Sequence, residues 1–96
     1  MMFCKMLKII LANQFKKDLK LARKRGLDIS LLNTVVTKLA NEEPLAVKYR
    51  DHELKGNYAG FRECHIMPDW LLIYRIDGDD LMLFLARNGT HSDLFE

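Results

Sequence analysis

The chain has 96 residues, of which 49% are hydrophobic and 29% are charged. This length suits a single domain over residues 1–96, and the composition excludes a disordered chain. No apolar run approaches the roughly 20 residues of a membrane-spanning helix, and the run after Lys8 is too short for a secretory signal. We therefore expect a cytoplasmic protein with no membrane partner.

The formal net charge of +2 hides an uneven distribution of charge. Residues 1–40 carry nine Lys and Arg residues against two acidic ones, whereas residues 41–96 carry six against eleven. Many of the basic residues gather on one predicted helix, among them Lys16, Lys17, Lys20 and Lys24. Such a helix can hold nucleic-acid phosphates, although an ordinary solvated helix face explains the same pattern.

The first half of the chain predicts a strand and two helices. Residues 6–12 form a short apolar run typical of a strand, and Asn13 is a candidate N-cap for a helix that ends at Gly26. Asp28 can cap a second helix, which ends before Pro44. Two amphipathic helices in close succession predict a hairpin that packs on a partner surface.

The second half predicts that surface as a sheet. Three apolar-rich runs of strand length lie at residues 61–67, 70–76 and 81–87. Their connections are too short for the crossovers of parallel strands, and the second contains the hairpin signal Asp77-Gly78. We expect an α+β fold in which the N-terminal strand and the helical hairpin pack on a twisted antiparallel β-sheet.

All three histidines, His52, His65 and His91, lie in the second half. Histidine titrates near neutral pH and is the usual proton donor and acceptor in catalysis. Asp69 follows Pro68 at a predicted strand end, where it could orient or polarise a histidine, and a turn-forming role is the ordinary alternative. These residues predict an active site.

A metal site is less well supported. Strand alternation puts Cys64 and His65 on opposite faces, so these neighbours cannot chelate one ion together. Three histidines from separate segments remain an alternative way to hold an ion. Cys4 and Cys64 lack the CxxC spacing of zinc sites and are expected to be free and reduced. We expect neither a metal nor a cofactor.

Three strings of residues carry a resemblance to a known family. They are Asp-His-x-Leu-Lys-Gly-Asn-Tyr at 51–58, Phe-Arg-Glu-Cys-His-Ile-x-Pro-Asp-Trp-Leu-Leu-Ile-Tyr at 61–74, and Arg-x-Gly-Thr-His-Ser-Asp-Leu-Phe at 87–95. With them the chain resembles the YafQ branch of the RelE/ParE toxin superfamily, the mRNA interferases of bacterial type II toxin–antitoxin modules. The resemblance runs from about Met6 to Phe95, and residues 1–5 look like an N-terminal extension.

The resemblance implies a RelE-like, microbial RNase-like fold and ribosome-dependent cleavage of messenger RNA. It implies a site built from the matching residues His52, His65, Asp69, Trp70, His91 and Phe95. The implied partners are the ribosome with its rRNA and mRNA, and a DinJ-like ribbon-helix-helix antitoxin. The toxin–antitoxin complex is expected to bind operator DNA through the antitoxin and to repress its own operon.

Acid–base chemistry can cleave RNA without a metal. A base takes the proton of the 2′-hydroxyl, an acid protonates the leaving 5′-oxygen, and cations stabilise the phosphate. His52 or His65, one of them assisted by Asp69, is the candidate base, and the choice between them stays open. His91 is the candidate acid.

Other side chains are candidates for holding the RNA. Arg87 and Lys55 can stabilise the phosphate, and Arg62 is a weaker candidate because alternation puts it opposite His65. Trp70 and Phe95 can stack on unpaired bases. Core packing is the alternative for both aromatic residues, above all for Trp70.

Two other functions remain open. A ParE-like member would poison DNA gyrase by binding alone, but such an inhibitor has no need of three histidines. A phosphate-binding or regulatory module would use its histidines only structurally. Inducible expression in a bacterium separates the three, since cleaved mRNA, an SOS response and absence of toxicity are the respective outcomes.

Overall fold

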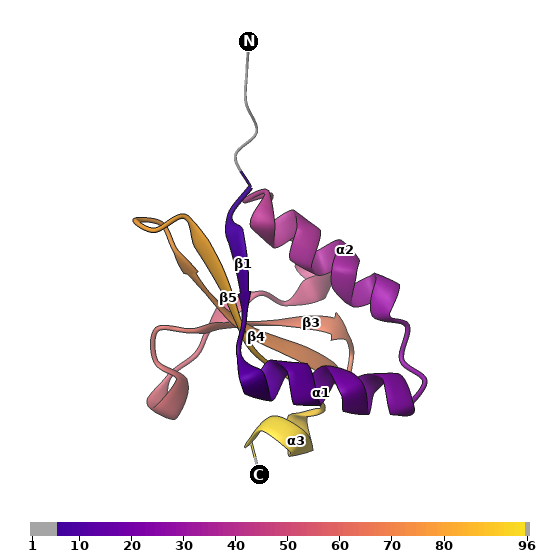
Figure 1. Cartoon of the computed structure of the whole chain (residues 1–96). Coiled ribbons are helices and arrows are strands. Elements are labelled where there is room, and N and C mark those ends of the chain that lie inside the picture. The colour runs from indigo at the N-terminus through magenta and orange to yellow at the C-terminus, as the bar shows by residue number, and fades with distance from the viewer. Residues whose placement is uncertain (1–5, 96) are drawn as a thin grey trace.

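A computed structural model describes residues 6–95, so the predicted N-terminal extension at 1–5 lies outside the described residues. In chain order the elements are β1 (Lys8–Leu11), α1 (Asn13–Lys24), α2 (Ile29–Ala40), the 3₁₀ turn η1 (Val47–Tyr49), β2 (His52–Glu53), the 3₁₀ turn η2 (Gly56–Tyr58), β3 (Arg62–Met67), β4 (Trp70–Asp77), β5 (Met82–Gly89) and α3 (His91–Phe95) (Figure 1). None of the described helices has the length and apolar character needed to cross a membrane.

The predicted helical hairpin is confirmed, with a shift of one residue at its start. Asn13 is the first residue of α1 rather than its N-cap. Gly26 follows α1 with a φ of 76°, a backbone conformation that a β-carbon disfavours. Asp28 caps α2 as predicted, because its side chain accepts a hydrogen bond from the backbone N–H of Ser30 at 3.0 Å.

The strand order in the sheet is β1-β5-β4-β3-β2. The predicted antiparallel meander of β3, β4 and β5 is confirmed. β1 pairs with β5 in parallel, so the sheet is mixed rather than antiparallel throughout. α1, α2 and the strands β2 to β4 lie between β1 and β5 in the sequence, so these two strands can pair in parallel, whereas the short connections between β3, β4 and β5 forbid it. β2, with two residues, was not predicted because so short a strand has no periodicity.

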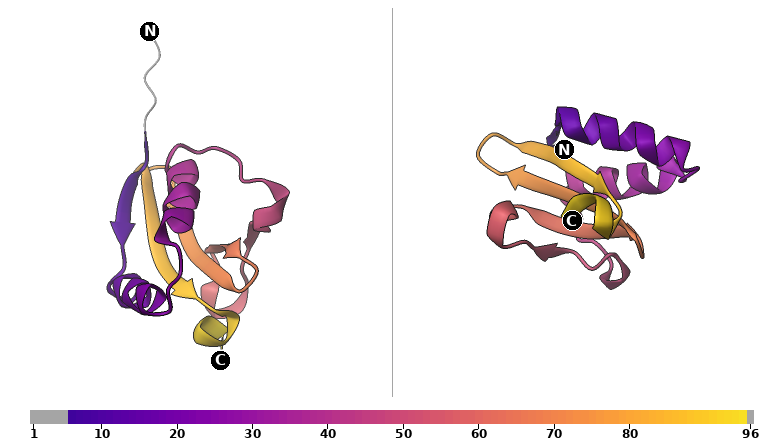
Figure 2. Two further views of the ribbon diagram at one scale, coloured as in Figure 1. Left: turned by 90° about the vertical axis from the view of Figure 1, so that its right-hand side faces the viewer. Right: turned by 90° about the horizontal axis from the view of Figure 1, so that it is seen from below.

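Different elements pack on the two faces of the sheet. α1 and α2 lie on one side, as both views in Figure 2 show, and Leu72 and Tyr74 of β4 point into the core beneath them. The alternate residues Leu71 and Ile73 point to the opposite side, which we call the second face. Leu94 of α3 completes a smaller apolar cluster there.

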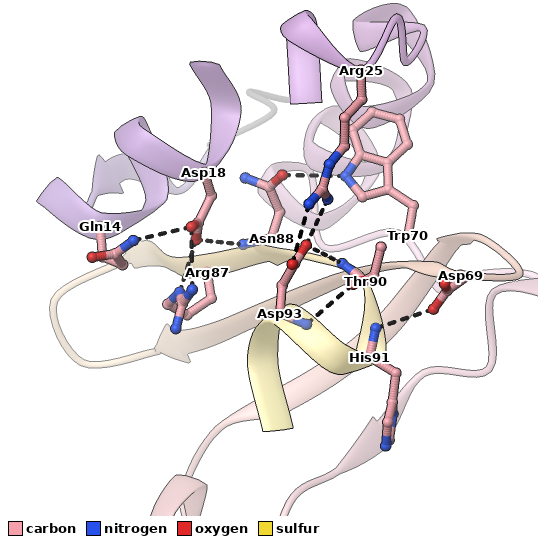
Figure 3. A network of polar contacts seen from close by, with 10 residues as sticks. All are labelled: Gln14, Asp18, Arg25, Asp69, Trp70, Arg87, Asn88, Thr90, His91 and Asp93. Carbon is pink, nitrogen blue, oxygen red and sulfur yellow. Dashed lines mark hydrogen bonds and ion pairs between the residues drawn. The ribbon is translucent and has the colours of Figure 1, made fainter. Parts of the chain in front are cut away.

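α1 also closes an open edge of β5. β1 pairs only with the first half of β5, from Met82 to Leu85, so on this edge the second half of β5 has no strand neighbour. There the carboxylate of Asp18 accepts hydrogen bonds from the backbone N–H of Asn88 at 3.2 Å and from Nε of Arg87 at 2.8 Å (Figure 3). Asp18 is buried, so these hydrogen bonds satisfy its carboxylate and the two N–H groups where water does not reach them.

Replacing Asp18 with Asn tests this closure. Asp18→Asn removes the charge that faces the partly buried Arg87, and we expect the free energy of unfolding to fall by about 2–4 kcal/mol in urea titrations followed by circular dichroism. Asp80→Asn is the matched control, because Asp80 is exposed in the β4–β5 hairpin and should change stability by less than about 0.5 kcal/mol. Equal stability of the two variants would show that α1 is held by apolar packing alone.

Candidate active site

The strand register brings several predicted site residues onto the second face. His52 of β2 pairs with Glu63 of β3, Glu63 pairs with Ile73 of β4, and Ile73 pairs with Arg87 of β5. Directly opposed residues of antiparallel strands share a face, so these four side chains form a row across the sheet. His65 lies two residues beyond Glu63 on the same face. His52, His65 and Arg87 are therefore gathered by the sheet itself.

One carboxylate lies between two imidazoles. Oε1 of Glu63 is 3.5 Å from Nε2 of His52 and 3.5 Å from Nε2 of His65. Glu63 is buried, whereas half of the His52 side chain is exposed. A carboxylate at this distance can pair with a protonated imidazole on either side. The two histidines thus share one counter-charge.

Backbone carbonyls determine which imidazole nitrogen is free. Nδ1 of His52 lies 2.7 Å from the carbonyl oxygen of Arg50, and Nδ1 of His65 lies 3.3 Å from that of Pro68. A carbonyl oxygen only accepts, so each Nδ1 carries a proton and donates it. In the neutral form each Nε2 then presents a lone pair. Both histidines are arranged to take up a proton on Nε2.

α3 is fixed to the end of β5 by a capping box. The backbone N–H of Asp93 donates to Oγ1 of Thr90, and the backbone N–H of Thr90 donates to Asp93. Arg25, next to the end of α1, donates to the same Asp93 at 2.6 Å, and this ion pair holds the pKa of that carboxyl well below its usual range (Figure 3). A β-carbon at Gly89 would stand 3.0 Å from Cβ of Asp93, a tighter contact than most, so any larger residue would press α3 away from the end of β5.

His91 is the first residue of α3, and its backbone and its side chain have different partners. Its backbone N–H donates to Oδ1 of Asp69 at 3.0 Å, so Asp69 orients His91 through the main chain rather than by polarising an imidazole. The imidazole points away from this network in Figure 3 and lies with its centroid 5.0 Å from that of Phe95. Phe95 in turn meets Tyr58 edge-on at 5.9 Å. Because Leu94 packs on the second face, α3 brings its histidine to the same side as the other two.

Cationic and aromatic side chains border this side. The Asp18 carboxylate and, more weakly, the Tyr58 hydroxyl raise the pKa of Arg87, which keeps the guanidinium charged. Lys55 and Phe95 line one hollow of about 620 Å³ together with Tyr58. Lys55 and Phe95, 40 residues apart in the sequence, are thus brought together.

The predicted stacking role of Trp70 does not fit the structure. Its side chain is 1% exposed and belongs to the core beneath the helices. Its indole Nε1 donates to Oδ1 of the equally buried Asn88 at 3.2 Å. The alternative of core packing is therefore correct for Trp70, because β4 begins with it and alternation turns it toward the helices.

Arg62 is directed away from the histidines, as alternation predicts. Its guanidinium donates to the carboxylate of Asp51 at 3.1 Å and lies 3.7 Å from Glu53. Asp51 also accepts a hydrogen bond from the hydroxyl of Tyr74, which is buried under the helices. Arg62 therefore stabilises the segment before β2 and is not gathered with the other candidate cations.

The basic residues predicted on the first helix are all exposed. They share the solvent-facing side of α1 and comprise Lys16, Lys17, Lys20 and Lys24. Arg25 follows them and is already paired with Asp93 of α3. The basic surface of α1 thus adjoins the helix that carries His91.

Cys64 contributes neither a nucleophile nor a metal ligand. It is free and fully buried on the helix side of β3, and burial raises its pKa to about 12. Cys64 and His65 point apart, as predicted. Within residues 6–95, no group of three or more His, Cys, Asp or Glu side chains is arranged to hold a metal ion.

Two parts of the site were missed in the sequence, although both carry a signal. Period-two alternation puts Glu63 on the face of His65, but its contact with His52 depends on the short strand β2. The spacing of Thr90 and Asp93 is that of a capping box and predicts a helix at the C-terminal end. Each signal involves only a few residues, and neither can be recognised as part of a site before the fold is known.

Comparison with known proteins agrees with this geometry. A family model described as "Bacterial toxin of type II toxin-antitoxin system, YafQ" matches residues 7–96. The mRNA interferase toxin YafQ of Escherichia coli K12 is 44% identical over 85 residues, which are 88% of this chain and 90% of that protein.

Solved structures agree as well. The crystal structure of a metal-bound toxin from Helicobacter pylori has 53% identity and a TM-score of 0.89, covering 94% of this chain and 100% of that one. The toxin chain in the E. coli DinJ–YafQ toxin–antitoxin complex has 41% identity and a TM-score of 0.85, covering 95% and 99%. The chain therefore belongs to the YafQ family of bacterial toxins of type II toxin–antitoxin systems.

Proposed function

We propose that this toxin is an endoribonuclease that cuts messenger RNA on the ribosome, in the cytoplasm, by acid–base catalysis without a metal. One observation carries the proposal: two imidazoles meet the carboxylate of Glu63 on the face where α3 presents a third, His91. A binding inhibitor has no use for this arrangement. The name of the E. coli relative, mRNA interferase toxin, supports the same activity.

The candidate bases, His52 and His65, lie on strands of the sheet. Nε2 of His52 or of His65 takes the proton of the 2′-hydroxyl, and the resulting imidazolium is stabilised by Glu63. The 2′-oxygen then attacks the neighbouring phosphorus and forms a cyclic phosphate as the bond to the 5′-oxygen breaks. Both histidines have the required lone pair, and their shared carboxylate allows a proton to reside on either.

The candidate acid, His91, lies on α3. His91 gives its proton to the leaving 5′-oxygen, with its ring supported by Phe95 at 5.0 Å between centroids. Asp69 holds the backbone of His91 and so sets the distance between acid and base. Arg87, at the end of the row of side chains that includes His52 and Glu63, supplies positive charge for the phosphorane.

The RNA and the ribosome are held outside this centre. Lys55 and the exposed ring of Phe95 border the hollow beside Tyr58, where a phosphate and an unpaired base can be bound together. The lysines of α1 form an exposed basic surface suited to the phosphates of ribosomal RNA.

The cognate inhibitor is proposed from the relatives. The toxin of the E. coli complex is bound to DinJ, and a DinJ-like ribbon-helix-helix antitoxin is the corresponding partner here. Operator DNA would be bound through that antitoxin. The test of the whole proposal is primer extension on mRNA bound to translating ribosomes after addition of purified toxin, where new 5′ ends are expected and an intact message would contradict it.

Loss of the acid should abolish cutting while leaving binding. We expect His91→Gln to lower the single-turnover cleavage rate on the ribosome by about 10²- to 10⁴-fold, because glutamine cannot donate a proton in this way. Ribosome binding, measured by co-sedimentation, should stay within about twofold. Ser92→Ala is the control, since Ser92 is the exposed neighbour in α3 and should cut normally. Undiminished cutting by His91→Gln would remove His91 from the mechanism.

Glu63 should act through the two histidines. Glu63→Gln keeps the shape of the side chain but removes the charge, and we expect cleavage to slow by about 10- to 100-fold with little change in KM. In a double-mutant cycle with His65→Gln the two effects should be less than additive, because the part of the Glu63 effect that acts through His65 is lost once that imidazole is gone. Full additivity would mean that Glu63 serves only the stability of β3, which urea unfolding of Glu63→Gln would reveal.

Chelators distinguish this mechanism from metal-assisted cleavage. The H. pylori relative was crystallised with a bound metal. For this chain we expect EDTA to leave the cleavage rate unchanged when the toxin is treated before addition to ribosomes kept in magnesium. Activity that is lost on treatment and restored by zinc or copper would contradict the acid–base scheme.

A further inference from the structure

We propose that a pocket beside His65, separate from the hollow near Phe95, binds the nucleotide of the messenger RNA that adjoins the cut bond. The pocket lies between α2, η1 and the end of β3, and its volume is about 400 Å³. Ligand sites for small molecules start at roughly 300 Å³, so one nucleotide fits and a folded partner does not. This inference rests on the proposed function, since it names where that same substrate lies.

The pocket is positively charged. Lys48 and Arg50 line it, and no acidic residue does. In the part of the chain that the structure describes, neither residue forms an ion pair, so both charges are available to a ligand. A pocket with two uncompensated cations favours an anion such as the phosphate of a nucleotide.

The wall of the pocket suits a flat base. Tyr49 is half-buried there, and Leu31 and Met67 line it with 40% and 41% of their surface exposed. The ammonium of Lys48 lies 5.1 Å from the centroid of the Tyr49 ring, so charge and aromatic surface occur together. Exposed aromatic and apolar side chains beside cations are the usual platform for an unpaired base.

His65 connects the pocket with the catalytic centre. It lines the pocket, and its Nε2 lies 3.5 Å from Glu63, the carboxylate that also contacts His52. Pro68, whose carbonyl oxygen accepts from Nδ1 of His65, lines the pocket too. An RNA strand with its scissile phosphate at Nε2 of His65 would therefore place its next nucleotide at the pocket mouth. Continuity with the catalytic imidazole favours RNA over a peptide of the antitoxin.

A tryptophan placed in the pocket tests this assignment. Thr34 is exposed on α2 and lines the pocket, so Thr34→Trp should fill it. We expect KM for cleavage of ribosome-bound mRNA to rise by about tenfold, the loss of one base contact, and the distribution of cut positions to change, with kcat within about twofold. Thr37→Trp is the matched control, since Thr37 is exposed on the same helix but does not line this pocket.

Nucleotide binding can be measured without cleavage. A DNA trinucleotide lacks the 2′-hydroxyl and stays intact, and its titration should shift the NMR signals of Tyr49 and of the Met67 methyl group. Thr34→Trp and Lys48→Ala should weaken that binding by about tenfold, and Thr37→Trp should not.

The outcomes separate this inference from the proposed function. If the parent cuts mRNA and Thr34→Trp cuts the same positions with the same KM, the pocket is not a substrate site although the function stands. If the parent cuts nothing but the trinucleotide still shifts Tyr49 and Met67, the function fails and the pocket remains a nucleotide site. If Thr34→Trp cuts normally but escapes neutralisation by the antitoxin, the pocket takes a protein segment and the inference is wrong.

Discussion

The carboxylate of Asp18 is the contact on which the arrangement of the site depends. β1 is too short to cover the whole edge of β5, and α1 covers the remainder, where the buried backbone N–H of Asn88 needs an acceptor. Asp18 accepts that bond and also holds Arg87, which lies in the row of site residues. The same side chain thus attaches the helical layer to the sheet and sets the position of Arg87, the proposed cation of the site.

The proposed site divides its residues between the sheet and a short helix after its last strand. The proposed bases, His52 and His65, are held by strand pairing, by a backbone carbonyl each and by the shared carboxylate of Glu63. The proposed acid, His91, opens a five-residue helix whose attachment depends on Asp93 and its capping box. The proposed bases are therefore part of the sheet, and the proposed acid lies on the helix that follows its last strand.

Local signals in the sequence predicted most of the fold, and contacts between distant residues account for what was missed. Asp28 and Gly26 mark helix ends through bonds to near neighbours, so the sequence alone reveals them. The ion pair of Asp18 with Arg87 joins residues 69 positions apart, and nothing local indicates it. Likewise, alternation placed Glu63 on the correct face but could not show that β2 would bring His52 to its other side.

The ion pair between Arg25 and Asp93 links the end of α1 to the tail. Its two residues are 68 positions apart, and both are partly exposed, so solvent ions and neighbouring molecules can reach them. Any ligand that draws Arg25 away, such as a phosphate group at the end of the basic helix, would loosen the attachment of α3 and with it the position of His91. Under the proposed mechanism, the position of the acid would then depend on what binds at the end of α1 as well as on the contacts within α3.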